Sequence, residues 1–284
     1  MENTFPRTID SNYCKPIPFL RWAGGKSWLL KHLATLLPNF DFNSYHEPFL
    51  GGGATFFHLN PTNKSFLSDL NFDLIHTYLT IQENVERVIV ELKKFKNTKS
   101  FYYEIRNKNF KNDYKKAACF IYLNQTSFNG IYRVNLDGNY NVPYGFRTKN
   151  FIQPTNLRLA SLALQNAKIQ HHDFDIIRAN IKKGDFVFLD PPYTVTHNNN
   201  GFIKYNQKIF SLDDQYRLSN LIDFICAKGC YYVLTNAAHS EIEKIFEKGH
   251  NKFHLQRKSL IAANNEKRGQ YAEVIFTNIR ISKN

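Results

Sequence analysis

Short apolar runs alternate with amphipathic stretches along residues 156–284. Apolar runs bounded by turn residues predict buried strands, and apolar positions three and four residues apart predict helices. The predicted strands are Lys168–His171, Phe186–Leu189, Tyr231–Leu234 and Ala272–Asn278, and the predicted helices are Leu157–Asn166, Leu212–Lys228 and Ser240–Glu247. Because strands and helices alternate, the pattern predicts an α/β sheet.

The rest of the chain divides into two zones. Residues 1–75 hold two glycine-rich turns, the second of which leads from a predicted strand into a predicted helix. Residues 76–155 are polar, aromatic and helical in pattern, and they run into a turn-rich stretch near Asn135–Gly145. We therefore predict one α/β domain made of residues 1–75 and 156–284, with an inserted, mainly helical domain over residues 76–155.

The charge of the 284-residue chain indicates a polyanionic partner. The formal net charge is +13, and 43% hydrophobic residues argue for a folded protein. Nucleic acid is favoured over a membrane surface, since the chain has no convincing basic amphipathic helix. No apolar run is long enough to span a membrane, and the residues after Met1 lack the pattern of a signal peptide. These features predict a cytoplasmic protein.

Four cysteines are present, Cys14, Cys119, Cys226 and Cys230. Cys226 and Cys230 are spaced four residues apart, in what the pattern predicts to be one helix. No His or Cys pair nearby in the sequence completes a zinc site, so we expect free thiols and no metal.

The sequence Asp190-Pro191-Pro192-Tyr193 follows the predicted strand Phe186–Leu189. Ligands of open α/β sheets bind at the carboxyl ends of the strands. A carboxylate and a neighbouring main-chain carbonyl can accept the two N–H bonds of an exocyclic amine and localise its lone pair. Proline has no N–H, so the turn presents acceptors only, and Tyr193 can stack on a flat base. The alternative is a strand followed by a proline-rich turn without chemistry.

Two glycine-rich turns precede this motif. Gly25-Lys26-Ser27 resembles the end of a phosphate-binding P-loop, but that motif needs a glycine where this chain has Leu20. The second turn, Gly51–Gly53, lets the backbone approach a ligand closely. Asp69, at the end of the next predicted strand, is placed to hold ribose hydroxyls. The alternative for this pair is a tight turn and a surface aspartate.

These motifs and their order resemble the Dam-type DNA adenine N6-methyltransferases, from Leu20 to about Asn278. The resemblance implies a Rossmann-like sheet that uses S-adenosyl-L-methionine, with an inserted target-recognition domain that binds double-stranded DNA. It implies a monomer that acts alone or beside a cognate restriction endonuclease. The cofactor-binding residues it implies are Trp22, Lys26, Glu47, Phe49, Gly51, Asp69, Asn71, Asp173, Phe174 and Asp190.

The resemblance extends to a DNA-contacting hairpin formed by Phe128–Arg133 and Asn141–Gly145. An aromatic wedge at Phe128 would aid base extrusion, and Arg133 would contact guanine. The DNA-binding residues it implies are Arg21, Phe128, Asn129, Ile131, Arg133, Asn141 and Pro143. Without the resemblance, Phe128 is equally well explained as a core aromatic and Arg133 as a phosphate contact. Thr194–Asn206 and Ala262–Gln270 are predicted loops that become ordered on DNA.

The predicted reaction is methyl transfer to N6 of a flipped-out adenine, with GATC as the expected target. Asp190 and the Pro191 carbonyl would accept the N6 hydrogens, Pro192 would stiffen the turn, and Tyr193 would stack on the base. Two alternatives are an amino-methyltransferase acting on RNA, cytosine N4 or protein, and a catalytically inactive DNA-binding relative.

Overall fold

A computed structural model describes residues 15–22, 25, 29–30, 41–135, 138–193, 210–258 and 270–280. The chain forms two compact units. The helical unit contains the described residues of Met1–Lys26, Gly52–Asn60 and Thr77–Gln165. The sheet unit contains those of Ser27–Gly51, Pro61–His76 and Asn166–Asn284.

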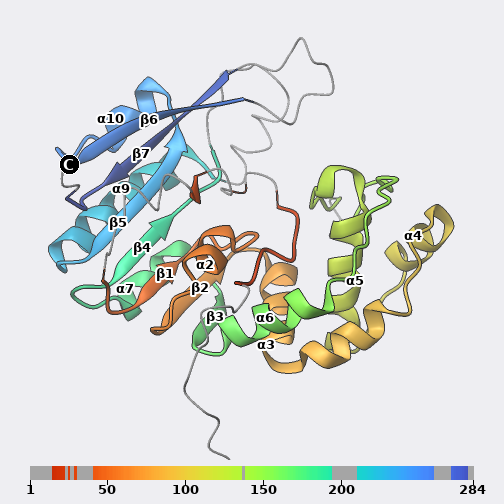
Figure 1. Cartoon of the computed structure of the whole chain (residues 1–284). Coiled ribbons are helices and arrows are strands. Elements are labelled where there is room, and N and C mark those ends of the chain that lie inside the picture. The colour runs from red at the N-terminus through yellow and green to blue at the C-terminus, as the bar shows by residue number, and fades with distance from the viewer. Residues whose placement is uncertain are drawn as a thin grey trace, which may run out of the picture. The chain divides into compact units, whose positions relative to one another are not determined.

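Seven strands form one sheet in the sheet unit (Figure 1). They are β1 (Tyr45–Glu47), β2 (Ser65–Asp69), β3 (Ala167–His171), β4 (Phe186–Leu189), β5 (Tyr231–Ala237), β6 (Asn251–Lys258) and β7 (Gln270–Thr277). The strand order is β3-β2-β1-β4-β5-β7-β6. Strands β1 to β5 pair in parallel, and β7 is antiparallel to both β5 and β6. The predicted α/β, Rossmann-like class is therefore confirmed.

The helices are α2 (Ala54–Leu59), α3 (Phe72–Leu92), α4 (Lys99–Arg106), α5 (Asp113–Thr126), α6 (Pro154–Leu164), α7 (Ile177–Asn180), α9 (Leu212–Ala227) and α10 (Ser240–Ile245). Two short 3-10 turns, η1 (Phe128–Gly130) and η2 (Phe174–Ile176), lie between them. Among the described residues, no helix is long and apolar enough to cross a membrane.

Helix α9 shows how the sequence builds the core of the sheet unit. Leu218, Leu221, Ile222 and Ile225 are spaced three and four residues apart, so they form one buried stripe. This stripe belongs to the same core cluster as buried residues of β4, β5 and β7. The Ser211 hydroxyl accepts the Asp214 N–H while the Asp214 carboxylate accepts the Ser211 N–H, which fixes where the helix begins.

Two details of the sequence-based prediction were wrong or missing. The predicted helix over Leu212–Lys228 ends at Ala227, and Gly229 follows with a φ of 70°. Cys230 therefore lies outside the helix that we predicted to hold it with Cys226, because a left-handed glycine ends the helix between them. Strand β6 was not predicted, since Phe253 and Leu255 alternate with basic and polar residues at the edge of the sheet.

Buried tyrosines form the core of the helical unit. Tyr102 and Tyr122 are fully buried, and their rings lie 6.2 Å apart. The Tyr102 hydroxyl donates to the Val142 carbonyl, and the Tyr122 hydroxyl donates to the Lys96 carbonyl. Burial raises the pKa of both hydroxyls, so both stay protonated and keep donating.

A buried hydrogen bond between Asp185 and His46 ties the turn before β4 to β1. Asp185 Oδ2 lies 2.9 Å from His46 Nε2 and accepts the Lys182 N–H at 2.8 Å. Its other oxygen accepts the Ser44 N–H at 3.1 Å. The side chains of both Asp185 and His46 are almost fully buried. The Asp185 carboxylate therefore accepts hydrogen bonds from two main-chain N–H groups and from the buried imidazole ring of His46.

We expect Asp185→Ala to lower the free energy of unfolding by about 3 kcal/mol, because the buried His46 ring and two main-chain N–H groups lose their acceptor. The measurement is urea denaturation. The control is Asp223→Ala, which removes an exposed ion pair with Lys248 and should cost less than about 1 kcal/mol. Equal losses for the two variants would contradict the anchoring role of Asp185.

Candidate active site

The strand order reverses at β1, which lies between β2 and β4. Strands β2 and β3 continue on one side of β1, and β4 and β5 continue on the other. Ligands of open parallel sheets bind at such a switch point, at the carboxyl ends of the strands. The predicted residues of the sheet unit follow these strand ends: Glu47, Phe49 and Gly51 at β1, Asp69 and Asn71 at β2, Asp173 and Phe174 after β3, and Asp190–Tyr193 after β4.

Asp69 braces the glycine loop. Its Oδ2 accepts the Gly51 N–H at 2.9 Å, and its Oδ1 accepts the Asn71 N–H at 2.9 Å. The Leu50 N–H bonds to the Ser68 carbonyl, which adds a main-chain link between the loop and β2. Burial raises the pKa of the Asp69 carboxyl, although the hydrogen bonds from Gly51 and Asn71 act in the opposite direction. The carboxylate thus holds the loop in place and leaves lone pairs for further donors.

The side chains in and just after β1 are packed against their neighbours. Glu47 is buried and accepts a hydrogen bond from the Tyr45 hydroxyl at 2.8 Å. Burial, and then the nearby Glu47 charge, raise the pKa of Tyr45 well above its usual value. The Phe49 ring stacks on Phe174 at 5.4 Å and meets Phe210 edge-on at 5.7 Å.

Arg217 of α9 organises the edge that follows β3. Its guanidinium donates to Asp173 at 2.8 Å and to Asp175 at 3.0 Å. It also lies over the Phe174 ring, 4.7 Å from the ring centre. The Phe174 side chain is only 2% exposed, so its ring belongs to the core. Asp173 additionally accepts the Asp175 N–H at the start of η2. In the same way, the Asn71 side chain accepts the Leu74 N–H at the start of α3.

The Asp190–Tyr193 segment is held by the two neighbouring strands. The Thr235 hydroxyl of β5 lies 2.6 Å from Asp190 Oδ1. The Tyr193 hydroxyl donates to Glu273 Oε2 of β7 at 3.0 Å, and Glu273 is 4% exposed. Both ends of the segment are therefore fixed by side chains from strands that come later in the chain.

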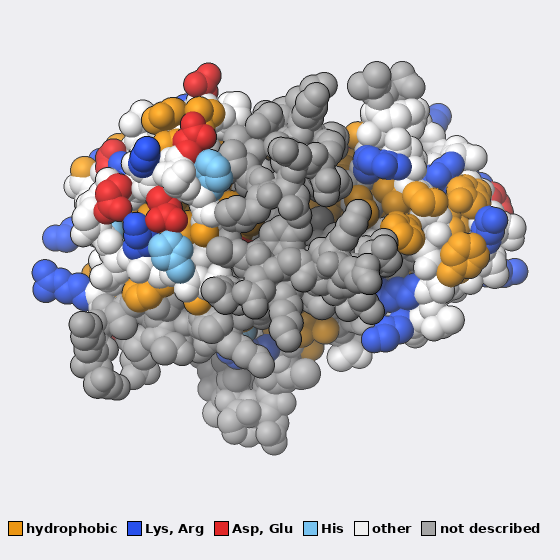
Figure 2. All heavy atoms as spheres, turned by 90° about the horizontal axis from the view of Figure 1, so that it is seen from above, with side chains coloured by type: hydrophobic (Ala, Val, Ile, Leu, Met, Phe, Trp, Pro, Cys, Tyr) orange, Lys and Arg blue, Asp and Glu red, His pale blue; other side chains and the backbone are white. Residues whose placement is uncertain are grey.

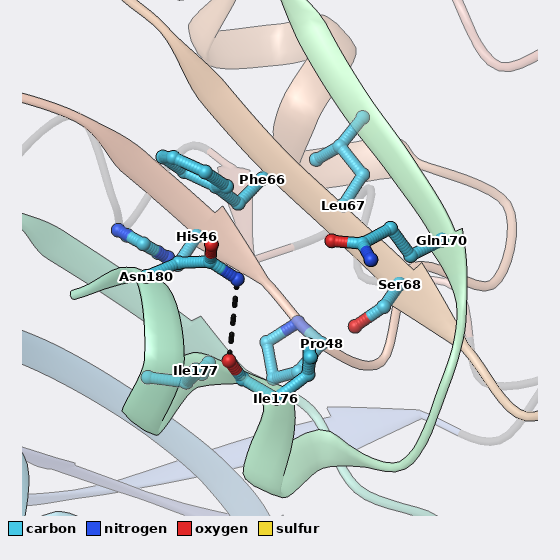
Figure 3. A pocket seen from close by; sticks show the side chains of 9 residues that line it. All are labelled: His46, Pro48, Phe66, Leu67, Ser68, Gln170, Ile176, Ile177 and Asn180. Atoms are coloured by element: carbon cyan, nitrogen blue, oxygen red, sulfur yellow. Dashed lines mark hydrogen bonds between the residues drawn. The ribbon is translucent and has the colours of Figure 1, made fainter.

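A small cavity lies on one face of β1–β3, under η2 and α7 (Figure 3). Its volume of about 10 Å³ is that of a single water site. His46, Ser68 and Gln170 of the three strands line it, and the Asn180 amide at its rim donates to the Ile176 carbonyl at 3.3 Å. This cavity is too small to hold a nucleotide.

In the helical unit, the two segments of the predicted hairpin pair in antiparallel fashion. Bridges join Val134 to Tyr140 and Ser127 to Tyr144. The Phe128 N–H bonds to the Pro143 carbonyl at 2.9 Å, and the Asn141 N–H bonds to the Arg133 carbonyl at 3.1 Å.

Most of the hairpin residues that we predicted to contact DNA are exposed. Phe128 is 51% exposed, which is unusual for a phenylalanine and excludes its alternative as a core aromatic. Asn129, Arg133 and Pro143 are also exposed, while Ile131 and Asn141 are half-buried. The Arg133 guanidinium donates to Asn141 Oδ1 at 2.7 Å, which holds the arginine along the hairpin.

Arg21 and Trp22 attach to the base of this hairpin. The Asn124 amide is buried and exchanges hydrogen bonds of 2.7 Å with the main chain of Arg21. The Arg21 guanidinium donates to the Ser127 carbonyl at 3.3 Å, and the Trp22 ring stacks on Tyr132 at 5.7 Å. Arg21 is therefore built into the hairpin support. Lys26, predicted beside Trp22, lies outside the described residues.

The sequence matches the profile of the D12 class N6 adenine-specific DNA methyltransferase family over residues 22–261. The chain belongs to this family. It is therefore an adenine-specific DNA methyltransferase, as its sequence motifs predicted.

Three relatives with similar sequences align with this chain over nearly their whole length. The Type II methyltransferase M.MjaIII of Methanocaldococcus jannaschii is 34% identical, over 88% of this chain and 94% of the relative. The Type II methyltransferase M1.LlaDCHI of Lactococcus lactis subsp. cremoris is 33% identical, over 95% and 98%. A DNA adenine methylase of Haemophilus influenzae is 29% identical, over 91% and 92%.

Four residues were missed by the sequence analysis: Arg217, Thr235 and Glu273, which brace the candidate site, and Asn124, which supports the hairpin. No local motif marks them, because each acts across a long sequence separation. In the described ranges, no cluster of three or more His, Cys, Asp or Glu side chains is placed to hold a metal ion. The predicted loops Thr194–Asn206 and Ala262–Gln270 lie outside those ranges, except for Gln270, which is the first residue of β7.

We expect Gly145→Ala to open the hairpin. An added Cβ would lie 2.4 Å from the Ser127 carbonyl oxygen and 2.8 Å from the Phe128 nitrogen, so the paired segments must separate. Hydrogen exchange of the Phe128 and Gly145 amides, which bond across the hairpin, should speed up by about tenfold or more.

The matched control is Gly138→Ala at the hairpin tip. Gly138 has a φ of 78° but no atom within 4 Å of an added Cβ, so only the cost of the left-handed backbone applies. Exchange of the same two amides should stay near its wild-type rate. Identical exchange in the two variants would show that contact with Ser127 does not hold the hairpin closed.

Proposed function

We propose that this enzyme transfers a methyl group from S-adenosyl-L-methionine to N6 of an adenine flipped out of double-stranded DNA, within GATC. The observation that carries the proposal is that the glycine loop and the Asp190–Tyr193 segment follow β1 and β4, the two strands that flank the switch point. That edge is where a parallel sheet binds a nucleotide-like ligand.

The residues of the sheet unit fit such a cofactor. Gly51 has a φ of 47°, and its main chain is held by Asp69, so the backbone can approach a ligand closely. Asp69 and Asn71 offer oxygens to ribose hydroxyls, Glu47 offers a carboxylate, and Phe49 offers an apolar wall. Asp173 and the main chain of Phe174 would hold the adenine ring. When bound, the cofactor supplies a methyl group that its sulfonium has already activated.

Asp190 and the Pro191 carbonyl then act on the target amine. Two acceptors that take both N6 hydrogens localise the nitrogen lone pair, which can attack the methyl carbon as its bond to sulfur breaks. The methylated amine is a cation and acidic, so it loses one proton to water or through Asp190. Pro192 keeps the turn rigid, and Tyr193 stacks on the base. The enzyme contributes positioning and electrostatics.

Adenine N6 in a duplex cannot meet the methyl carbon in line, which is why the base must leave the stack. We assign the helical unit to target recognition, with Phe128 as the wedge and Arg133 as a guanine contact. Residues 77–165 carry 14 Lys and Arg against six Asp and Glu. On the face drawn in Figure 2, the helical unit displays Lys and Arg among hydrophobic side chains and little acidic surface.

The GATC target is inferred from the likeness of the hairpin sequence to that of GATC-specific Dam-type enzymes. A cognate restriction endonuclease is a further prediction, because relatives of the chain include both Type II methyltransferases and DNA adenine methylases.

We expect Asp190→Ala to lower the rate of methyl transfer by at least 100-fold, since the amine loses its charged acceptor. The measurement is transfer of tritium from labelled S-adenosyl-L-methionine to a GATC duplex and to the same duplex with N6-methyladenine. DNA affinity should change less than threefold. Substantial activity in the variant, or equal labelling of the two duplexes, would rule out the proposed chemistry.

We expect Arg133→Ala to relax specificity at one base pair. A bidentate arginine–guanine contact contributes about 1–3 kcal/mol of discrimination. The methylation rate of the GATC duplex should therefore fall, while that of the duplex with a different base pair at the contacted position should not. The measurement is the methylation rate of GATC and of every single-base variant.

The control is Lys111→Ala in the same unit. A lysine that contacts only phosphate weakens binding to all sequences alike and lowers the salt slope by about one unit. If Arg133→Ala lowers the methylation rate of every duplex by the same factor, as Lys111→Ala should, then Arg133 contacts the DNA phosphate backbone and not a base.

A further inference from the structure

Thr235 lies beside Asp190 because of the register between β4 and β5. Leu189 of β4 pairs with Leu234 of β5, so the next residue of each strand follows side by side. Thr235 Oγ1 lies 2.6 Å from Asp190 Oδ1 and 3.5 Å from the Leu189 carbonyl oxygen. The Thr235 hydroxyl is the donor and Asp190 Oδ1 is the acceptor. The short distance is typical of a hydroxyl bound to a charged oxygen.

The position of Thr235 is fixed from both sides. It is 1% exposed, and it pairs with Ile275 of β7 on the side of β5 away from β4. Its branched side chain has few rotamers, which limits where the hydroxyl can point. Water and mobile side chains therefore do not replace this donor easily.

The Asp190 carboxylate needs such a restraint. The torsion that turns the plane of an aspartate carboxylate is soft, so the side chain alone does not fix its oxygens. An oxygen must lie along an N–H bond of the target amine to accept it well. We propose that Thr235 is a positioning residue for methyl transfer, whose hydroxyl holds the Asp190 carboxylate in the orientation that accepts the amine. This inference rests on the proposed role of Asp190.

The test compares three variants by the single-turnover rate of methyl transfer and by the Kd for cofactor and for DNA. Thr235→Val keeps the shape but removes the donor, and it should lower the rate by ~10- to 100-fold, the range for a hydrogen bond to a charged group. Both Kd values should stay within about twofold, because Thr235→Val leaves the Asp190 carboxylate in the site and changes only how firmly that carboxylate is oriented toward the amine. Thr235→Ser restores the donor and should recover most of the rate.

Thr277→Val is the matched control. Thr277 of β7 is equally buried, and its hydroxyl donates to the Tyr232 carbonyl at 2.6 Å, two positions along the ladder from Thr235. Thr277→Val should lower stability at least as much as Thr235→Val does, since Thr277 Oγ1 also accepts the Ile279 N–H at 3.1 Å, while the rate stays within about twofold of wild type. A similar fall in rate for Thr277→Val would mean that the effect is structural and would overturn the inference.

Two further outcomes separate this inference from the proposed function. If Asp190→Ala is inactive but Thr235→Val transfers at the wild-type rate, Asp190 acts without Thr235 and only the inference fails. If Asp190→Ala keeps its activity, the proposed function fails first. A rate for Thr235→Ser as low as that of Thr235→Val would also overturn the inference, because the hydroxyl would then not be the group that matters.

Discussion

The reversal of strand order at β1 is the constraint on which the candidate site depends. Parallel strands end at the same edge of a sheet, so residues separated by more than a hundred positions in the sequence gather there without any local signal between them. Ligands of parallel sheets bind beside such a reversal, at the carboxyl ends of the strands. The buried Asp185–His46 pair supports the same two strands, since it ties the turn before β4 to β1.

Polar side chains at this edge form hydrogen bonds to the protein's own main chain or to one another. Asp69 holds Gly51, Asn71 starts α3, and Asp173 starts η2. Asp190 and Tyr193 are held in turn by Thr235 and Glu273. A group whose hydrogen bonds are already made does not reorganise when charge develops during a reaction, which is the physical basis of electrostatic catalysis. The same bonds make these residues hard to replace without moving the backbone.

The sequence predicted the elements that have a local signal. Phe186–Leu189 was predicted to the residue, because a continuous apolar run ends at a carboxylate and two prolines. Strand β6 was missed because an edge strand alternates apolar and charged residues over a short length. Thr235 and Glu273 could not be found at all, since their partners lie 45 and 80 positions away and only the strand register brings them together. Registers between distant strands are set by packing, which one sequence does not reveal.

The hairpin of the helical unit is held together in a different way from the sheet edge. Its shape depends on a few main-chain bonds, on the close approach of Gly145 to Ser127, and on Asn124 at its base. Phe128, Asn129 and Arg133 project from it and are exposed, so exchanging them removes little buried area. Side chains that carry so little of the stability can be exchanged without unfolding the hairpin, which suits the DNA-contacting role that we propose for them. The edge residues that also hold main chain cannot be exchanged in this way, because their replacement would leave main-chain N–H groups without an acceptor.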